Sequence, residues 1–190
     1  MQRLNLVDPA QAQGQTKELL DTVESAFGTV PNVAKVLANS PAVLDSYLAF
    51  AQAMCGAAIG ETLHHQVKLA TSEENSCEYC TSILSELGSG AGLSAEDLIA
   101  TREGHSKDEL TDAALTFTKA VLETGGKVTN AQLNAVREAG FNDGEIVEII
   151  ASAVLGAFTN FVNNVADTEL DIPRAQPLAT CSSGTCQAVA

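Results

Sequence analysis

Residues 66–80 read Gln-Val-Lys-Leu-Ala-Thr-Ser-Glu-Glu-Asn-Ser-Cys-Glu-Tyr-Cys, and this stretch decides the fold. Its first half completes a helix that the apolar spacing predicts over residues 61–74. Its second half places a Cys-x-x-Cys pair, Cys77 and Cys80, at the start of the next predicted helix, residues 77–87. The stretch therefore predicts two successive helices with two thiols at the turn between them.

The sequence on both sides of this stretch also predicts helices. Alternating runs of Val, Ile and Thr are scarce, while Ala, Leu and Glu dominate. Helix starts are marked by Ser40-Pro41, by capping-box patterns that begin at Ser106 and Thr129, and by Asn142-Asp-Gly-Glu145 before the last helix. We expect helices over residues 9–27, 31–37, 41–54, 61–74 and 77–87, a short one from residue 94, and three more over 106–123, from 129 for about ten residues, and 142–170.

A chain of 190 residues suits one domain with a tail, and it is long enough to fold without a disulfide or a metal. We expect an all-α, single-domain bundle of about eight to nine helices over residues 1–170. Pro173 and Pro177 exclude a continued helix, so residues 171–190 are predicted to form an extended, flexible tail.

The composition excludes several classes of function. Ten basic and 24 acidic residues give a net charge of −14, which argues against a nucleic-acid-binding surface. Aromatic residues make up 4% and Trp is absent, so base stacking is not expected either. No signal peptide is visible, and the longest apolar candidate, residues 146–165, is interrupted by polar residues. We expect a cytoplasmic protein with no membrane partner.

The Cys77–Cys80 spacing suits redox chemistry. Residues three apart share a helix face, so the two sulfurs can form a disulfide with little backbone motion, and a helix N-terminus stabilises a thiolate. A structural zinc site that adds Cys181 and Cys186 as ligands, or a pair of thiols without a role, remains an alternative. Cys55 lies among Met and Ala residues and is expected to be a small buried hydrophobic residue.

Three segments together resemble one known family. Residues 66–80, 140–150 and 159–173 are similar to the core of the alkylhydroperoxidase D / carboxymuconolactone decarboxylase superfamily, in its peroxidase-related branch. The resemblance covers roughly residues 10–173. It implies an all-helical fold that assembles into trimers or hexamers. Carboxymuconolactone decarboxylation is disfavoured, because in the family that branch works without the cysteine pair.

The resemblance also implies roles for individual residues. In the family the second Cys attacks the peroxide and the first resolves it, which assigns these roles to Cys80 and Cys77. The proton-relay Glu of the family falls on His65, and its relay His falls on Leu84, which cannot move a proton. A further His of the peroxidase-related branch falls on Asn164. We expect His65 to take the proton of the attacking thiol as a substitute.

The sequence therefore predicts a thiol-dependent oxidoreductase that reduces hydroperoxides or disulfides and takes electrons from a dithiol donor protein or a small thiol. No cofactor and no metal is expected for this reaction. Cys181 and Cys186 in the tail are a possible electron shuttle. The alternatives are a non-catalytic or redox-sensing family member that acts as an oligomeric scaffold, and a structural zinc protein.

Overall fold

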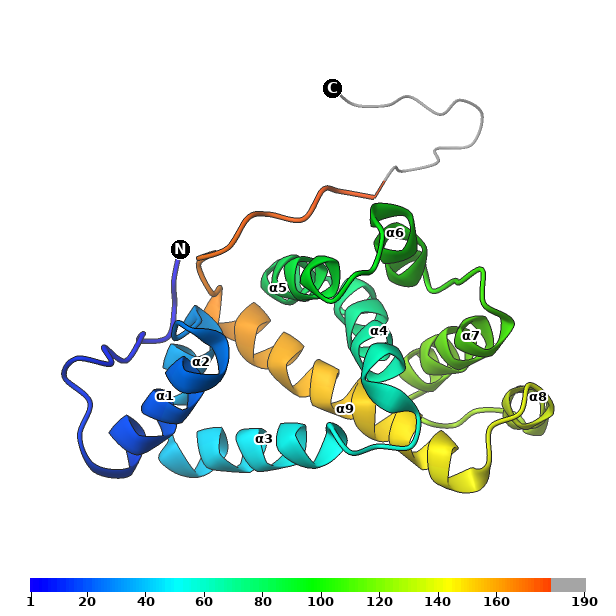
Figure 1. Ribbon diagram of the computed structural model, residues 1–190, viewed down its shortest axis with the longest axis horizontal. Helices are drawn as coiled ribbons and strands as arrows, with labels where there is room; N and C mark the ends of the chain where they lie inside the picture. The colour runs from blue at the N-terminus through cyan, green and yellow to red at the C-terminus, as the bar shows by residue number, and fades with distance from the viewer. Residues whose placement is uncertain (179–190) are drawn as a thin grey trace.

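The computed structural model describes residues 1–178, and within them it contains nine α-helices and no strand (Figure 1). The all-α expectation is confirmed. The helices are α1 Gly14–Phe27, α2 Asn32–Leu37, α3 Pro41–Met54, α4 Gly60–Glu74, α5 Glu78–Gly90, α6 Ala95–Glu103, α7 Glu109–Thr124, α8 Asn130–Glu138 and α9 Asp143–Ala166.

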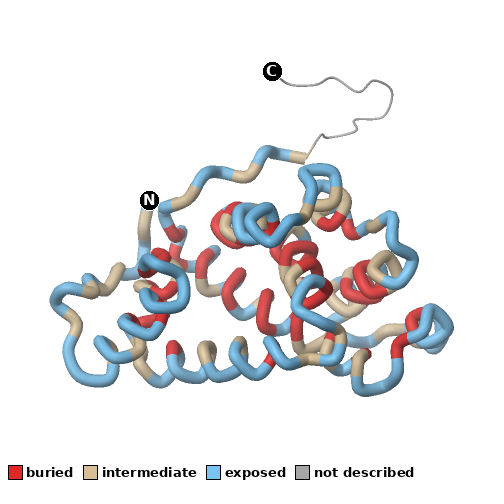
Figure 2. The backbone as a smooth tube through the Cα atoms, in the orientation of Figure 1, coloured by how far each residue is buried: buried red, intermediate tan, exposed pale blue. Residues whose placement is uncertain are grey.

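Helices α4 and α9 cross at the centre of the molecule, with α1–α3 on one side and α6–α8 on the other (Figure 1). Gly156 of α9 makes the close approach, since a Cβ there would lie 3.3 Å from Thr71 Cγ2 and 3.4 Å from Lys68 Cα. By length and composition alone α9 would pass for a membrane span. Its position against α4 and its row of buried residues are those of a core helix (Figure 2).

Besides a small cluster of Cys77, Tyr79 and Cys80, two separate apolar clusters fill the interior. The larger one joins α4, α7, α8 and α9, and the smaller one joins α1, α2 and the start of α3. The larger cluster comprises Leu63, Val67, Ala70, Ala114, Leu115, Phe117, Val136, Phe141, Ile146, Ile149 and Ala153. The smaller cluster comprises Leu20, Val23, Val30, Ala34, Leu37, Ala38 and Leu44. Helix α5 lies beside the second cluster and carries the cysteine pair.

Four helix boundaries differ from the sequence prediction by three residues or more. Helix α5 ends at Gly90 rather than residue 87, because the helix continues through Gly88. Helix α1 begins at Gly14 rather than residue 9, because residues 9–11 form a turn on Asp8. Helix α7 is capped by Asp108 rather than Ser106, since the Asp108 carboxylate accepts the Thr111 N–H at 2.8 Å. Helix α9 ends at Ala166 rather than near residue 170, because the next residue is left-handed with φ 50°.

Residues 171–178, after α9, form no helix and are tied to the helices. Asp171 accepts a hydrogen bond from the Tyr79 hydroxyl at 2.8 Å. The Ala175 N–H donates to Ser82 Oγ at 3.0 Å, so residues 171–178 run along α5. Residues 179–190, with Cys181 and Cys186, lie outside the described part of the chain.

Candidate functional site

The cysteine pair lies at the N-terminus of α5, where the sequence places it. Cys77 is the N-cap, and its sulfur accepts the Cys80 N–H at 3.3 Å. The two residues are joined as a disulfide with Cα atoms 5.3 Å apart. Both are buried, at 1% and 3% exposed. A reagent must therefore reach the sulfurs through an internal space.

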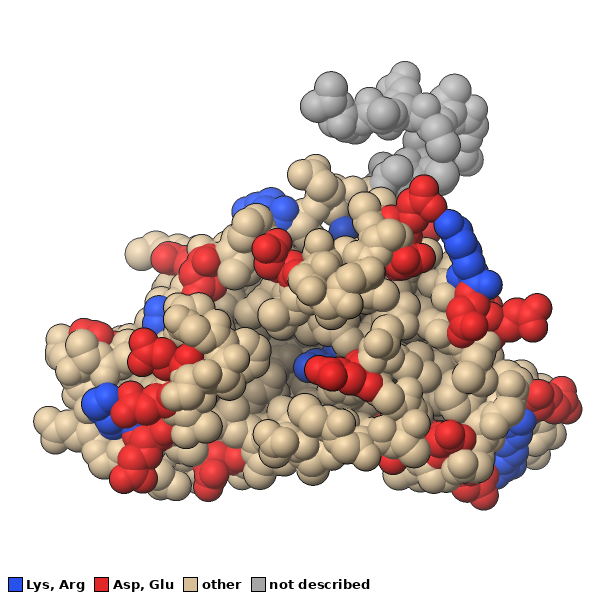
Figure 3. Space-filling model, viewed as in Figure 1, with Lys and Arg blue, Asp and Glu red and all other residues tan. Residues whose placement is uncertain are grey.

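Such a space lies directly beside Cys80. It is a cavity of about 100 Å³ between α1, α2, α3, α4, α5 and α9, and Cys80 is the only cysteine among the described residues that line it. In Figure 3 the surface is hollowed above α3; a basic group and an acidic side chain are seen at the hollow, and the other side chains around it are uncharged. The cavity is lined by Val23, Phe27, Pro31, Val33, Ala34, Leu44, Tyr47, Leu48, Lys68, Tyr79, Cys80, Ile83, Leu84, Leu87, Thr159 and Asn163.

An amide from α9 contacts the sulfur that lines the cavity. Asn163 Nδ2 donates to Cys80 Sγ at 3.2 Å, and the Asn163 side chain is buried. The family resemblance pointed instead to Asn164, which is exposed and donates to the Asn75 carbonyl at 2.9 Å. The residue of α9 next to the thiol is therefore Asn163. A hydrogen-bond donor at this distance stabilises a thiolate.

The two positions where the family places its relay residues also lie near α5, but in different hollows. Leu84 is buried and lines the cavity with Cys80, so the thiol does have an apolar neighbour one turn along its helix. His65 Nε2 donates to the Leu84 carbonyl at 2.8 Å. His65 lines an adjoining hollow with Glu61 rather than the cysteine cavity, and burial lowers its pKa. Its role as the proton acceptor stays a prediction.

Sequence reasoning missed Lys68. This residue of α4 is the only charged one among the described residues that line the cysteine cavity. Burial lowers its pKa, and the Cys55 thiol acts against that shift. Its flanking residues, Val67 and Leu69, are fully buried. The sequence signal that could have found it is a lysine between apolar residues on a helix expected to be buried.

Cys55 itself differs from its expectation. It follows the last turn of α3, is exposed and is a free cysteine, so it is not part of the core. Within residues 1–178 no group of three or more His, Cys, Asp or Glu side chains is arranged to hold a metal ion. The proposed zinc ligands Cys181 and Cys186, like the proposed shuttle, fall outside the described residues.

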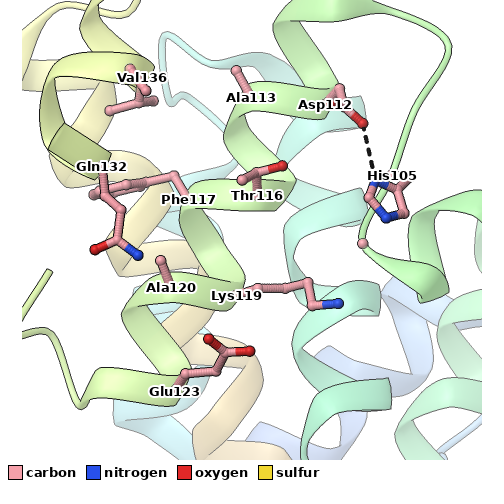
Figure 4. A pocket seen from close by; sticks show the side chains of 12 residues that line it. His105, Asp112, Ala113, Thr116, Phe117, Lys119, Ala120, Glu123, Gln132 and Val136 are labelled. Carbon is pink, nitrogen blue, oxygen red and sulfur yellow. Dashed lines mark ion pairs between the residues drawn. The ribbon is translucent and has the colours of Figure 1, made fainter. Parts of the chain in front are cut away.

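A larger hollow of about 510 Å³ lies on the far side of the molecule, between α7, α8 and the loop after α6. Figure 4 shows its side chains, with His105 Nδ1 and Asp112 Oδ1 3.4 Å apart. Both members of this ion pair have exposed side chains. No cysteine is among the described residues that line the hollow. Of these two hollows, only the smaller one is therefore lined by a described cysteine.

No protein-family model matches the sequence, and no curated protein is significantly similar to it. Solved structures are similar in fold. An uncharacterized peroxidase-related protein from Ralstonia eutropha, with an alkylhydroperoxidase D core, superposes with a TM-score of 0.74 at 23% identity, covering 88% of this chain and 91% of that one. A peroxidase-related protein from Silicibacter sp. gives 0.76 at 21% identity over the same shares of the two chains.

The chain has the alkylhydroperoxidase D fold. A third structure with this fold is a cysteine-to-alanine variant of the debrominase Bmp8 in complex with 2,3,4-tribromopyrrole. It has a TM-score of 0.74 at 18% identity and covers 90% of this chain and 94% of that one. At these identities the likeness extends to the fold and no further.

Proposed function

We propose that this protein is a thiol-dependent oxidoreductase whose Cys77–Cys80 couple reduces hydroperoxides or disulfides. The observation that carries the proposal is the unequal position of the two buried thiols. Cys80 lines the apolar cavity beside Asn163, while Cys77 lies behind it at the helix N-cap. This arrangement suits Cys80 as the attacking thiol and Cys77 as the resolving thiol. The solved structures described as peroxidase-related support the same class of reaction.

The reaction with a hydroperoxide has two steps in this site. The Cys80 thiolate attacks the terminal oxygen and the O–O bond breaks, so that Cys80 becomes a sulfenic acid. The alkoxide takes up, through solvent, the proton that Cys80 released as it became a thiolate, and leaves as the alcohol. The Cys77 thiol then attacks the Cys80 sulfur, water leaves, and the Cys77–Cys80 disulfide forms. A dithiol donor returns two electrons and two protons by thiol–disulfide exchange. The Asn163 amide stabilises the attacking thiolate, and Leu84 supplies no base.

The experiment is mass spectrometry of peptides from the fully reduced protein after one equivalent of cumene hydroperoxide, with rapid alkylation over a time series. We expect fast formation of the Cys77–Cys80 disulfide. Cys80→Ser should form none, while Cys77→Ser should hold Cys80 as a sulfenic acid that dimedone traps. If both thiols are still alkylated after minutes, the proposal is wrong and the oligomeric scaffold becomes the better hypothesis. Mixed bonds to Cys181 or Cys186 would make the tail part of the reaction.

We further propose that the protein is cytoplasmic, needs no cofactor and works as a trimer or hexamer. The exposed apolar side chains on one face of α9 support contact between copies; they are Val154, Phe158, Phe161 and Val165. Light scattering coupled to size exclusion should give a multiple of the 19.7 kDa chain mass, and Phe161→Glu should lower it. A wild-type monomer at micromolar concentration would contradict this part of the proposal.

A further inference from the structure

The cysteine cavity combines an apolar wall with one cation. Fourteen of its lining residues besides Lys68 and Asn163 carry no ionised group at neutral pH, since they are aliphatic, aromatic, Thr or Cys. Lys68 enters from α4, a helix that packs against α5 and its Cys80. A molecule that reaches the Cys80 sulfur is therefore surrounded by apolar surface with a single ammonium group in reach. Among the described residues, Lys68 is the one charged residue in an otherwise uncharged cavity lining.

The Lys68 ammonium has no counterion within the described residues. None of the ion pairs among residues 1–178 includes it, although seven other basic groups are paired. No carboxylate contributes to the electrostatics of its Nζ, and burial lowers its pKa. Burying an ammonium group is unfavourable unless an opposite charge or hydrogen bonds compensate it. An anionic group that entered the cavity would supply that compensation.

The overall charge of the protein acts in the opposite direction. A net charge of −14 disfavours an anion at long range, but salt screens exposed charges over about 10 Å. A partly buried pair in an apolar cavity is screened much less. The local cation therefore governs which molecules are held against Cys80, and the distant carboxylates govern only how fast they arrive.

We propose that Lys68 selects small substrates that join an apolar body to an anionic group, so that the reducible bond lies against Cys80. This inference rests on the proposed function and names its substrate class: a disulfide or hydroperoxide that carries a carboxylate or a similar anion. In exchange with a disulfide, the Cys80 thiolate attacks one sulfur and the other half leaves as a thiolate. Cys77 then displaces the first half, also as a thiolate, and the Cys77–Cys80 disulfide takes up the two oxidising equivalents.

Three small disulfides of similar size test the selection: 3,3′-dithiodipropionate is anionic, bis(2-hydroxyethyl) disulfide is neutral and cystamine is cationic. The protein is the full chain, reduced, with Cys55→Ser, Cys181→Ser and Cys186→Ser so that only the buried pair reacts. Second-order rate constants for the reaction with each disulfide are measured for the protein with Lys68 and for its Lys68→Met and Lys68→Arg variants. Lys17→Met, on the exposed face of α1, is the matched control because it changes the net charge equally.

We expect Lys68→Met to lower the rate of the anionic disulfide by about tenfold relative to the neutral one, and to raise the rate of cystamine. Lys68→Arg and Lys17→Met should keep the wild-type order. An equal change for all three disulfides would overturn the inference, because it would mean that Lys68 acts on the thiolate and not on the substrate. If Lys68→Met does not fold, Lys68→Gln replaces it. Loss of the wild-type order of the three rate constants in Lys68→Gln would then support the inference. Failure of every disulfide to react with wild-type Cys80 would overturn the proposed function itself.

Discussion

The two sides of helix α4 are packed in different ways. On the side of α7 and α9 the interior is filled, and Val67, Leu115 and Ile149 are fully buried in one cluster. On the side of α3 and α5 the same helix faces a cavity that reaches Cys80. Filled interior stabilises the fold, whereas an unfilled space beside a thiol costs stability. The comparison teaches that reactivity and stability are divided between the two faces of one helix.

The largest effect is expected from a base placed on the side of α4 that faces the cavity, which we call the open side; the side packed against α7 and α9 is the filled side. Leu84→His puts an imidazole one turn after Cys80, inside the same cavity. General-base help is worth about 10²-fold or more, so peroxide reduction should rise by that factor. Stopped-flow rates with cumene hydroperoxide measure it. Leu87→His, which lines the cavity further along α5, is the control and should give little gain.

An unchanged rate in Leu84→His would show that proton transfer does not limit the reaction of Cys80. The predicted role of His65 would then be tested by His65→Gln. Because His65 lies in the adjoining hollow, we expect this second variant to change the rate less than Leu84→His does.

The next effect concerns a histidine on the filled side. Ser152 donates its hydroxyl proton to the Glu148 carbonyl at 2.7 Å, so His64 Nδ1 donates to Ser152 Oγ at 2.8 Å. Burial lowers the pKa of His64 from 6.5 to about 4. Between these values the unfolded chain binds a proton that the folded chain does not. Stability is therefore complete above pH 6.5 and falls by up to about 3 kcal/mol as the pH drops to 4.

Urea unfolding at pH 7.5, 5.5 and 4.5 checks this pH dependence. His64→Gln should lose part of it, because the glutamine does not titrate, while the exposed His105→Gln should keep it. The same acid loss in His64→Gln as in the wild type would mean that other groups cause it.

A pair of matched substitutions tests the division between the two sides directly. Ala34→Leu on α2 extends into the cavity, whereas Ala153→Leu on α9 extends into the filled cluster. We expect Ala34→Leu to slow disulfide formation at Cys80 by about tenfold or more while the urea midpoint changes little. Ala153→Leu should cost about 1–3 kcal/mol of unfolding free energy. Equal destabilisation by both variants would contradict the comparison.

Much of the fold could be predicted from local sequence. The capping box at Thr129 has the predicted partner, and α9 starts at the predicted Asn142, since these signals depend on residues three apart. The cysteine pair was predictable for the same reason. The cavity and Lys68 were not, because they depend on which helices face each other across the molecule. Asn163 and Asn164 differ by about 100° around α9, and the packing of α9 against α5 decides between them.

The smallest expected effect comes from that asparagine. Asn163→Ala removes the donor 3.2 Å from Cys80 Sγ, so the thiolate loses one hydrogen bond. A hydrogen bond to a charged group is worth about 1.5 kcal/mol, which predicts that alkylation of reduced Cys80 by iodoacetamide at pH 7 slows by about tenfold. The midpoint of its pH profile should move to higher pH.

Asn164→Ala is the matched control for this change. Its amide donates to the Asn75 carbonyl and does not contact either sulfur, so alkylation should be unchanged. If both variants slow alkylation equally, the effect comes from the packing of α9. If only Asn163→Ala does, an amide on the central helix tunes the thiol that lines the cavity. The helix that completes the filled side would then also set the reactivity of the open side.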